Sequence, residues 1–242
     1  MIKEAIDRII SLADGGILET SDGRKLWSKT GSPIEEPSMK PITTVKTLSA
    51  LLSAFDGPEL SKEPREFLQV IVDDEHRVSV KSSADKVWKK RDTFIQAVLD
   101  SREFPFGRHL DQEEFVISVQ CMFADGADKK AVIDFVSSIA SEEVMQSDDN
   151  GVAQSLVTKT AAHGRKESTR VGPIVTLKPF RTFPDVDQPE SQFLLRFTQR
   201  KGALPLIALH EADGGKWRIQ ATKNIAEFLR AQLDDRGISV IG

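Results

Sequence analysis

The residues with the most evident chemistry lie between positions 178 and 183, where cations alternate with phenylalanines in KPFRTF. Lys178 and Arg181 could hold phosphates, and Phe180 and Phe183 could stack on bases if they are exposed. A proline-rich turn follows, so we expect both phenylalanines to lie outside the core. Cations on the solvated face of strands would give the same pattern, and both interpretations stay open.

A second group of basic residues precedes KPFRTF, in the sequence AAHGRKESTR. Arg165, Lys166 and Arg170 could hold phosphates from a flexible loop, because guanidinium groups suit bidentate phosphate contacts. Residues 151–201 carry nine Lys/Arg against four Asp/Glu, whereas the whole chain has a net charge of −4. The positive charge is therefore local, and the acidic remainder weakens a general affinity for nucleic acid.

The other reactive side chains form no recognisable catalytic or metal site. The chain has neither GxxxxGK[ST] nor GxGxxG, and its four histidines are far apart. The acidic DDEHR (73–77) is typical of a hairpin tip, and HLDQEE (109–114) of a helix start. The lone Cys121 falls in a helical apolar pattern, which predicts a buried thiol. The sequence therefore predicts a non-enzymatic protein without cofactor or metal.

Hydrophobic periodicity predicts the elements of the first 140 residues. The patterns indicate, in order, a helix at 2–10, a hairpin at 17–28, a loop at 30–42, a helix at 45–55, a hairpin at 68–80, a strand at 91–100, and two helices at 111–123 and 131–139. Asp111 and Glu114 are spaced as a helix N-cap with a returning carboxylate. The two mid-chain helices are expected to form a pair.

Strand patterns dominate after the break at SDDNG (147–151). Phe193, Leu195 and Phe197 alternate with polar residues, so we expect them to face the core. Further strands are predicted at 204–209 and 217–221, followed by a helix over 225–233 and a terminal strand. Pro205 has no N–H, which places its strand at a sheet edge or interrupts it.

Short, hairpin-length connections and grouped helices favour an α+β fold over a parallel α/β fold. We expect antiparallel sheets and hairpins, a mid-chain helical pair and a C-terminal helix. The predicted division is an N-terminal helix–hairpin–helix region (1–65), which can also be part of the same domain, and a main α+β domain (66–242). No internal repeat is visible.

The composition is ordinary for a water-soluble globular chain, with 39% hydrophobic and 29% charged residues. No apolar run approaches the ~20 residues that a membrane span needs. The N-terminus carries acidic residues and lacks the features of a signal peptide. A single cysteine suits a reducing compartment. These features predict a cytoplasmic protein with no membrane partner.

Two segments, LKPFRTFPDVDQPESQFLLRF and ALPLIALHEADGGKWRIQATKNIAEFLRAQL, resemble the YfdQ-like family of phage and prophage proteins of unknown function. The helix DQEEFVISVQ resembles that family's central acidic-aromatic helix. The likeness covers about residues 90–242. It implies a phage or prophage origin and a bacterial cytoplasm, and it supplies no catalytic residues.

The sequence is compatible with three functional hypotheses. The first is a phage-encoded accessory protein that binds a host or phage protein and blocks or sequesters it, with homo-oligomerisation as a further expectation. The second is a nucleic-acid-binding accessory of phage replication or recombination. The third is a sponge for a nucleotide messenger of antiviral defence. The last two depend on Arg165, Lys166, Arg170, Lys178, Phe180, Arg181 and Phe183.

Overall fold

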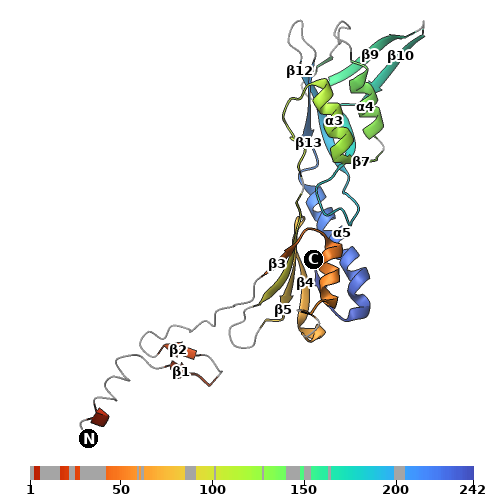
Figure 1. Ribbon diagram of the computed structural model, residues 1–242. Coiled ribbons are helices and arrows are strands. Elements are labelled where there is room, and N and C mark those ends of the chain that lie inside the picture. Colours follow the sequence, from red (N-terminus) through yellow and green to blue (C-terminus); the bar gives the residue numbers. More distant parts are fainter. Residues whose placement is uncertain are drawn as a thin grey trace.

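The computed structural model describes the greater part of the 242-residue chain in two lobes (Figure 1). The described residues are 3–5, 17–21, 25–27, 42–58, 60, 63–84, 91–100, 102–126, 128–139, 148–149, 154–162, 165–198 and 205–242. For residues 17–18, 27, 148–149, 154–162 and 165–170 only the backbone is described. We call the part at the top of Figure 1 the upper lobe and the part beneath it the lower lobe.

The upper lobe is a four-stranded sheet with two helices on one face (Figure 1). Its strands follow the order β13-β12-β11-β7, and all neighbours in it are antiparallel. The elements are α3 (Gln112–Met122), β7 (Phe123–Ala124), α4 (Lys129–Ser137), β11 (Ile174–Pro179), β12 (Ser191–Thr198) and β13 (Leu206–Glu211).

Alternation along β12 builds the upper core as the sequence predicted. Phe193, Leu195 and Phe197 are buried against α3 and α4, while the intervening residues are more exposed. Phe104 and Phe106 add edge-on and stacked ring contacts to Phe123 and Phe193. Such aromatic pairs contribute about 0.5–1.5 kcal/mol each beyond the burial of their area.

The predicted helical pair is confirmed, and its ends have clear physical causes. The Asp111 side chain accepts a hydrogen bond from the backbone N–H of Glu114 at 2.8 Å, which caps α3. Between the helices, the Lys129 ammonium is buried and donates to the carbonyl of Phe123 at 2.6 Å. It also pairs with Asp125 at 3.3 Å, so its charge is satisfied in the corner between α3 and α4.

The lower lobe is a five-stranded mixed sheet covered on one face by α2 and α5 (Figure 1). Its strands follow the order β14-β4-β5-β6-β3, with parallel pairs at both edges and antiparallel pairs between. The elements are β3 (Thr43–Val45), α2 (Leu48–Ser53), β4 (Leu68–Asp74), β5 (Arg77–Ser82), β6 (Thr93–Val98), α5 (Lys216–Leu233) and β14 (Ser239–Ile241).

The hairpin of β4 and β5, the strand β6 and the terminal strand β14 were predicted and are confirmed. The predicted strand at 217–221 is wrong, because α5 already begins at Lys216. Trp217, Ala221 and Ile225 are buried at a spacing of four, which is helical, whereas the alternation that suggested a strand covers only five residues. Val45 likewise lies in β3 and not in a helix.

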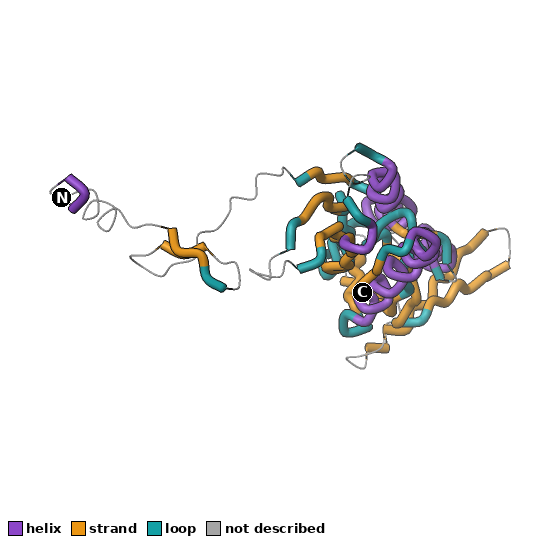
Figure 2. Tube along the Cα trace, turned by 90° about the horizontal axis from the view of Figure 1, so that it is seen from below, coloured by secondary structure: helices purple, strands orange, loops and turns teal. Residues whose placement is uncertain are grey.

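The remaining described strands form two smaller sheets. β1 (Ile17–Glu19) and β2 (Lys25–Trp27) pair antiparallel, as predicted for the hairpin at 17–28. β8 (Asp148–Asp149), β9 (Gln154–Ala162) and β10 (Arg165–Val171) form a three-stranded sheet in the order β10-β9-β8. The β9–β10 hairpin projects beyond the helices in both views (Figures 1 and 2).

The fold is therefore α+β, as predicted. The division at residue 65 stays a prediction. Leu48, Leu51 and Leu60, which precede it, pack in the same core as the strands β4, β5 and β6. Most of the predicted helix at 2–10 and most of the loop at 30–42 fall outside the described residues.

Candidate functional site

The loop of residues 180–190, between β11 and β12, joins the two lobes. Both of its flanking strands belong to the upper sheet. Phe183 is nevertheless fully buried in the lower core, and Val186 packs against that core. The loop therefore leaves one lobe, inserts into the other and returns, so any site built on it has a fixed position relative to both.

Arg181 is the first anchor of this loop, and it is buried with only 3% of its surface exposed. Its guanidinium carbon lies 4.0 Å from the ring centre of Trp217. The ring of Phe193, a residue of the upper lobe, also lies near the guanidinium. Its terminal nitrogens donate to the carboxylate of Glu211 and to the hydroxyl of Ser191. The side chain thus links α5 to β12 and β13.

Burial lowers the pKa of Arg181 to about 10, and the charges of Glu211 and Asp213 only partly offset that effect. The guanidinium therefore stays protonated at neutral pH. Asp213 completes the cluster by accepting from Ser191 at 2.7 Å. Burial raises the pKa of Asp213, but hydrogen bonds from Ser191 and Gly215 and the charge of Arg181 outweigh it, so the pKa lies below its usual value.

Gln188 holds the loop in shape from within. Its side-chain oxygen accepts from the backbone N–H groups of Arg181 and Thr182, at 3.0 and 3.2 Å. Its side-chain nitrogen donates to the carbonyl of Phe183 at 3.0 Å. A buried amide that satisfies this many backbone groups defines one loop conformation, because each alternative leaves polar groups unpaired.

The tip of the β4–β5 hairpin meets the same loop from the lower lobe. The ring nitrogen Nε2 of His76 lies 2.9 Å from the carbonyl oxygen of Arg181. The Thr182 hydroxyl donates to the carbonyl of Glu75 at 2.8 Å, and the Glu75 carboxylate pairs with Arg218 at 3.1 Å. The DDEHR segment is a hairpin tip, as predicted, and it also bonds the two lobes together.

Asp185 anchors the far side of the loop to α2. Its carboxylate accepts from the backbone N–H groups of Leu48 and Ser49, both at 3.0 Å, and from the Ser49 hydroxyl. An anionic acceptor at the first N–H groups of a helix is favourable both as a cap and towards the helix dipole. Burial raises the pKa of Asp185, but these hydrogen bonds outweigh it and hold the pKa below its usual value.

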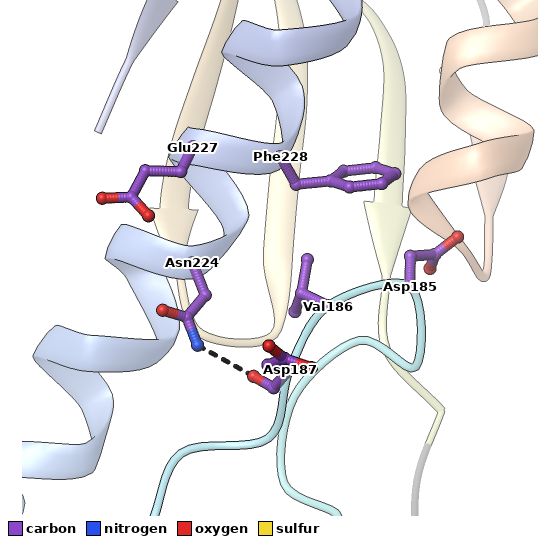
Figure 3. Close-up of a pocket in the computed structure, with 6 residues that line it drawn as sticks. All are labelled: Asp185, Val186, Asp187, Asn224, Glu227 and Phe228. Carbon is purple, nitrogen blue, oxygen red and sulfur yellow. Dashed lines mark hydrogen bonds between the residues drawn. The ribbon is translucent and has the colours of Figure 1, made fainter.

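A pocket of about 340 Å³ opens beside this anchored loop, where it runs along α5 (Figure 3). Phe228 and Val186 lie in its middle, with Glu227 on one side and Asp185 on the other. The carbonyl of Asp187 accepts from the Asn224 side chain at 2.8 Å, which fixes the loop to the helix. The lining residues are Asp185, Val186, Asp187, Asn224, Glu227 and Phe228.

The chemistry of this pocket is acidic and partly apolar. The carboxylate of Asp185 is bonded to α2, whereas those of Asp187 and Glu227 have no ion pair among the described residues. Phe228 and Val186 supply apolar surface that packs against the lower core. A cation with an apolar stem, such as a lysine or arginine side chain, is the group that matches both properties.

The structure contradicts the prediction that two of these residues, Arg181 and Phe183, are available for binding. Arg181 is buried in the joint between the lobes, and Phe183 is fully buried in the lower core, so neither can contact a ligand from the surface. The expectation that Phe183 is free was wrong because the loop turns inward after Arg181. Phe180 is 44% exposed, as expected, and Lys178 pairs with Glu190 at 3.3 Å.

The other predicted binding residues, Arg165, Lys166 and Arg170, lie in the strand β10 and not in a loop. Their backbone pairs with β9, and their side chains are outside what the structure describes. The seven predicted residues do not form one surface, because Arg181 and Phe183 are buried.

The prediction that the Cys121 thiol is buried was wrong, because Cys121 is exposed. Phe115 and Val119 define the buried stripe of α3, and a residue two positions beyond Val119 points to the other side of a helix.

Within the described ranges, no group of three or more His, Cys, Asp or Glu is arranged to hold a metal ion. No helix in those ranges is long and apolar enough to cross a membrane.

Sequence reasoning missed the pocket. Asn224, Glu227 and Phe228 share one face of α5 by their spacing, but the sequence does not reveal which loop lies opposite them. The only available signal was the acidic segment PDVD in a loop that was considered for its cations.

No protein-family model, curated protein or solved structure matches this chain.

Proposed function

We propose that this chain is a phage- or prophage-encoded accessory protein that acts without catalysis, by binding a bacterial or phage protein and blocking or sequestering it. The proposal places the contact at the pocket between the 180–190 loop and α5. The observation that carries it is the pair of Asp187 and Glu227, two carboxylates beside the half-buried Val186 and Phe228, with no ion pair among the described residues.

The partner is expected to present a lysine or arginine side chain to this pocket. Its charge would lie near Asp187 and Glu227, and its methylene stem would cover Phe228 and Val186. Partial exclusion of water by the ring strengthens such a pair relative to one on an open surface. The rim is already ordered by the bonds of Asp185 and Asn224, so binding costs little loop entropy.

The test compares a pocket variant with a matched control. The pocket variant carries Asp187→Asn and Glu227→Gln. The control carries Asp234→Asn and Asp235→Asn, two exposed carboxylates in the last turn before Gly237, so both variants lose two negative charges. Each full-length protein would be used to isolate a partner from its bacterial host, and the affinity for the purified partner would then be measured by calorimetry.

We expect the pocket variant to bind the partner at least ~10-fold more weakly, because it loses both carboxylates that face the partner's cation, and the control to bind like the original protein. Equal affinity of all three proteins would remove the pocket from the proposal. Turnover of a nucleotide or nucleic acid that one point substitution abolishes would overturn the non-catalytic function.

A further inference from the structure

The four-stranded sheet of the upper lobe has one face packed against α3 and α4 and one face that no described helix covers (Figure 1). We call the second the open face. Alternation along the strands places on it every second residue of β11, β12 and β13, starting from Ile174, Gln192 and Leu206. The register sets the three rows side by side, because Leu194 opposes both Ile174 and His210. None of these residues belongs to either hydrophobic core.

The open face is positively charged within an acidic chain. Its three rows contain Lys178 and Arg196 and no Asp or Glu, whereas the whole chain has a net charge of −4. Glu190, which directly precedes β12, pairs with Lys178 at 3.3 Å, but the two side chains remain 59% and 34% exposed. An ion pair this accessible contributes little to stability, so an anion from solution can replace Glu190. The face therefore favours an anionic ligand.

Arg196 provides a guanidinium whose hydrogen bonds are incomplete. It lies in β12 opposite Ala208, whose small side chain is fully buried. The Nη1 atom of Arg196 is buried without a hydrogen-bond partner, and Arg196 forms no ion pair among the described residues. An unsatisfied donor is costly, and a charge-assisted bond to a phosphate oxygen is the stronger kind of hydrogen bond. The side chain as a whole is only half-buried, so an anion can approach it from solvent.

Phe180 adds an exposed aromatic ring at one end of the open face. It follows β11 directly, and its backbone N–H donates to the carbonyl of Met122 at 2.9 Å, so the strand pairing continues through it. Alternation from Lys178 past the buried Pro179 places the ring on the open face, where it is 44% exposed. The ring packs in neither core. An exposed ring beside cations is the arrangement on which bases stack while their phosphates are held.

These features fit a single strand of nucleic acid better than a duplex or an acidic peptide. The bases of a single strand are free to stack on Phe180, whereas the bases of a duplex are already stacked on one another. An acidic peptide would satisfy Lys178 and Arg196 but has no planar group for the ring. The row from Ile174 to Phe180 is about 20 Å long, which leaves room for several nucleotides.

We propose that the open face binds single-stranded nucleic acid, with Phe180 stacked on a base and Lys178 and Arg196 in contact with phosphates. Contacts of this kind tolerate many sequences, because every base has a face that can stack. The pocket beside α5 belongs to the lower lobe and is acidic, so this activity is additional to the protein binding proposed for the pocket. Either one can fail without the other.

The first measurement is fluorescence anisotropy of a labelled oligothymidine of about 12 nucleotides with the full chain over a salt series. Two phosphate contacts predict a slope of log K against log[salt] of about −1.4 for a single strand. No binding, or a slope near zero, would overturn the proposal. The variant with Asp187→Asn and Glu227→Gln should bind the oligonucleotide no more weakly than the original protein, which separates this test from that of the pocket.

Phe180→Ala and Phe180→Leu test the stacking contact, and the leucine variant keeps most of the apolar volume. Both should bind oligothymidine about 10-fold more weakly but an abasic strand of equal length as well as the original protein does. Phe67→Ala is the matched control, because Phe67 is 53% exposed in the lower lobe, and it should change neither affinity. An equal loss for the abasic strand, or no loss for either strand, would contradict stacking.

Arg196→Gln tests the phosphate contact and should make the salt slope less steep by about 0.7. The control is Lys130→Gln, which removes an exposed cation from α4 on the other side of the same sheet and should leave the slope unchanged. Equal effects of the two substitutions would show that only net charge matters and would overturn the site. Thermal melts identify the variants that remain folded, and these decide the result.

Two competitors test the class of ligand. A DNA duplex and polyglutamate should each displace the labelled strand at least ~10-fold less effectively than unlabelled oligothymidine does, because neither offers a free base to Phe180. Polyglutamate that competes as well as oligothymidine would assign the open face to an acidic protein segment. A duplex that competes better would show that no stacking on free bases is involved. Either result would overturn the assignment to single strands.

Discussion

At the scale of single residues, the joint between the lobes depends on Arg181. A charge in a proline-rich loop would ordinarily stand in water, but here Trp217, Glu211 and Ser191 surround it. These partners come from parts of the chain that no local pattern connects to position 181. A buried, paired guanidinium contributes mainly to the uniqueness of the arrangement, because its desolvation cancels much of its attraction.

Arg181→Ala should lower the free energy of unfolding by about 2–4 kcal/mol, because it leaves a cavity and removes the stack on Trp217. Arg181→Met, which refills most of that volume without a charge, should cost less. Urea denaturation measures both. The control is Arg218→Ala, since Arg218 also lies over the Trp217 ring but is 65% exposed, and it should cost under about 1 kcal/mol. Equal losses for Arg181→Ala and Arg218→Ala would contradict this account.

Asp185→Asn tests the cap of α2 by its dependence on pH. The pKa of Asp185 is lowered in the folded protein, so its charge stabilises the fold above its unfolded pKa, and this contribution disappears as pH falls through the folded value. At pH 7 the variant should be less stable by about 1 kcal/mol. The difference should shrink below about pH 4. Urea denaturation at several pH values measures it, and a difference that stays constant down to pH 3 would exclude the charge as its cause.

At the scale of elements, period-two and period-3.6 patterns predicted most of what the structure contains. The strands β4, β5, β6 and β12 and the pair of α3 and α4 were found from alternation and capping alone, because each signal is local. The start of α5 was not found, because its first turn alternates like a strand. The pocket was not found, because it needs α5 and the 180–190 loop side by side, which is a tertiary fact.

Gly215 marks the actual start of α5, and its backbone is left-handed with φ of 81°. A side chain there is strained even though the surrounding space is open. We expect Gly215→Ala to lower stability by about 1–2 kcal/mol. Gly126→Ala is the matched control, because its Cβ would meet only the Lys178 side chain at 3.9 Å. It should be neutral or slightly stabilising in a thermal melt, and equal losses at both positions would contradict the strain at Gly215.

At the scale of the whole molecule, the loop of residues 180–190 links the two lobes by inserting deeply into the lower one. Phe183 is fully buried in the lower core, yet it lies on the loop between two strands of the upper sheet. His76 and Glu75 bond the lower hairpin to the same loop. The lobes have separate cores but should not unfold separately, because opening the lower one releases the loop that orders the upper one.

Phe183→Ala should therefore lower the protection of amides in both lobes by a similar amount, about 3–5 kcal/mol. Native-state hydrogen exchange of β5 and β12 measures the two lobes independently. A loss confined to β5 would show that the lobes open independently. Val78→Ala, a second substitution in the lower core, should likewise lower the protection of both β5 and β12, because opening the lower lobe releases the same loop.

The upper lobe lies in the sequence between two parts of the lower lobe, so the lower lobe is completed last during synthesis on the ribosome. The strands β3 to β6 are made early, but their partners α5 and β14 come only after the whole upper lobe has been translated. Through that interval the edge of β4 lacks β14, and the part of the apolar face that α5 covers stays open. An upper lobe that folds first would bring the two halves of the lower lobe together, and a chaperone would be needed most just before residue 216 emerges.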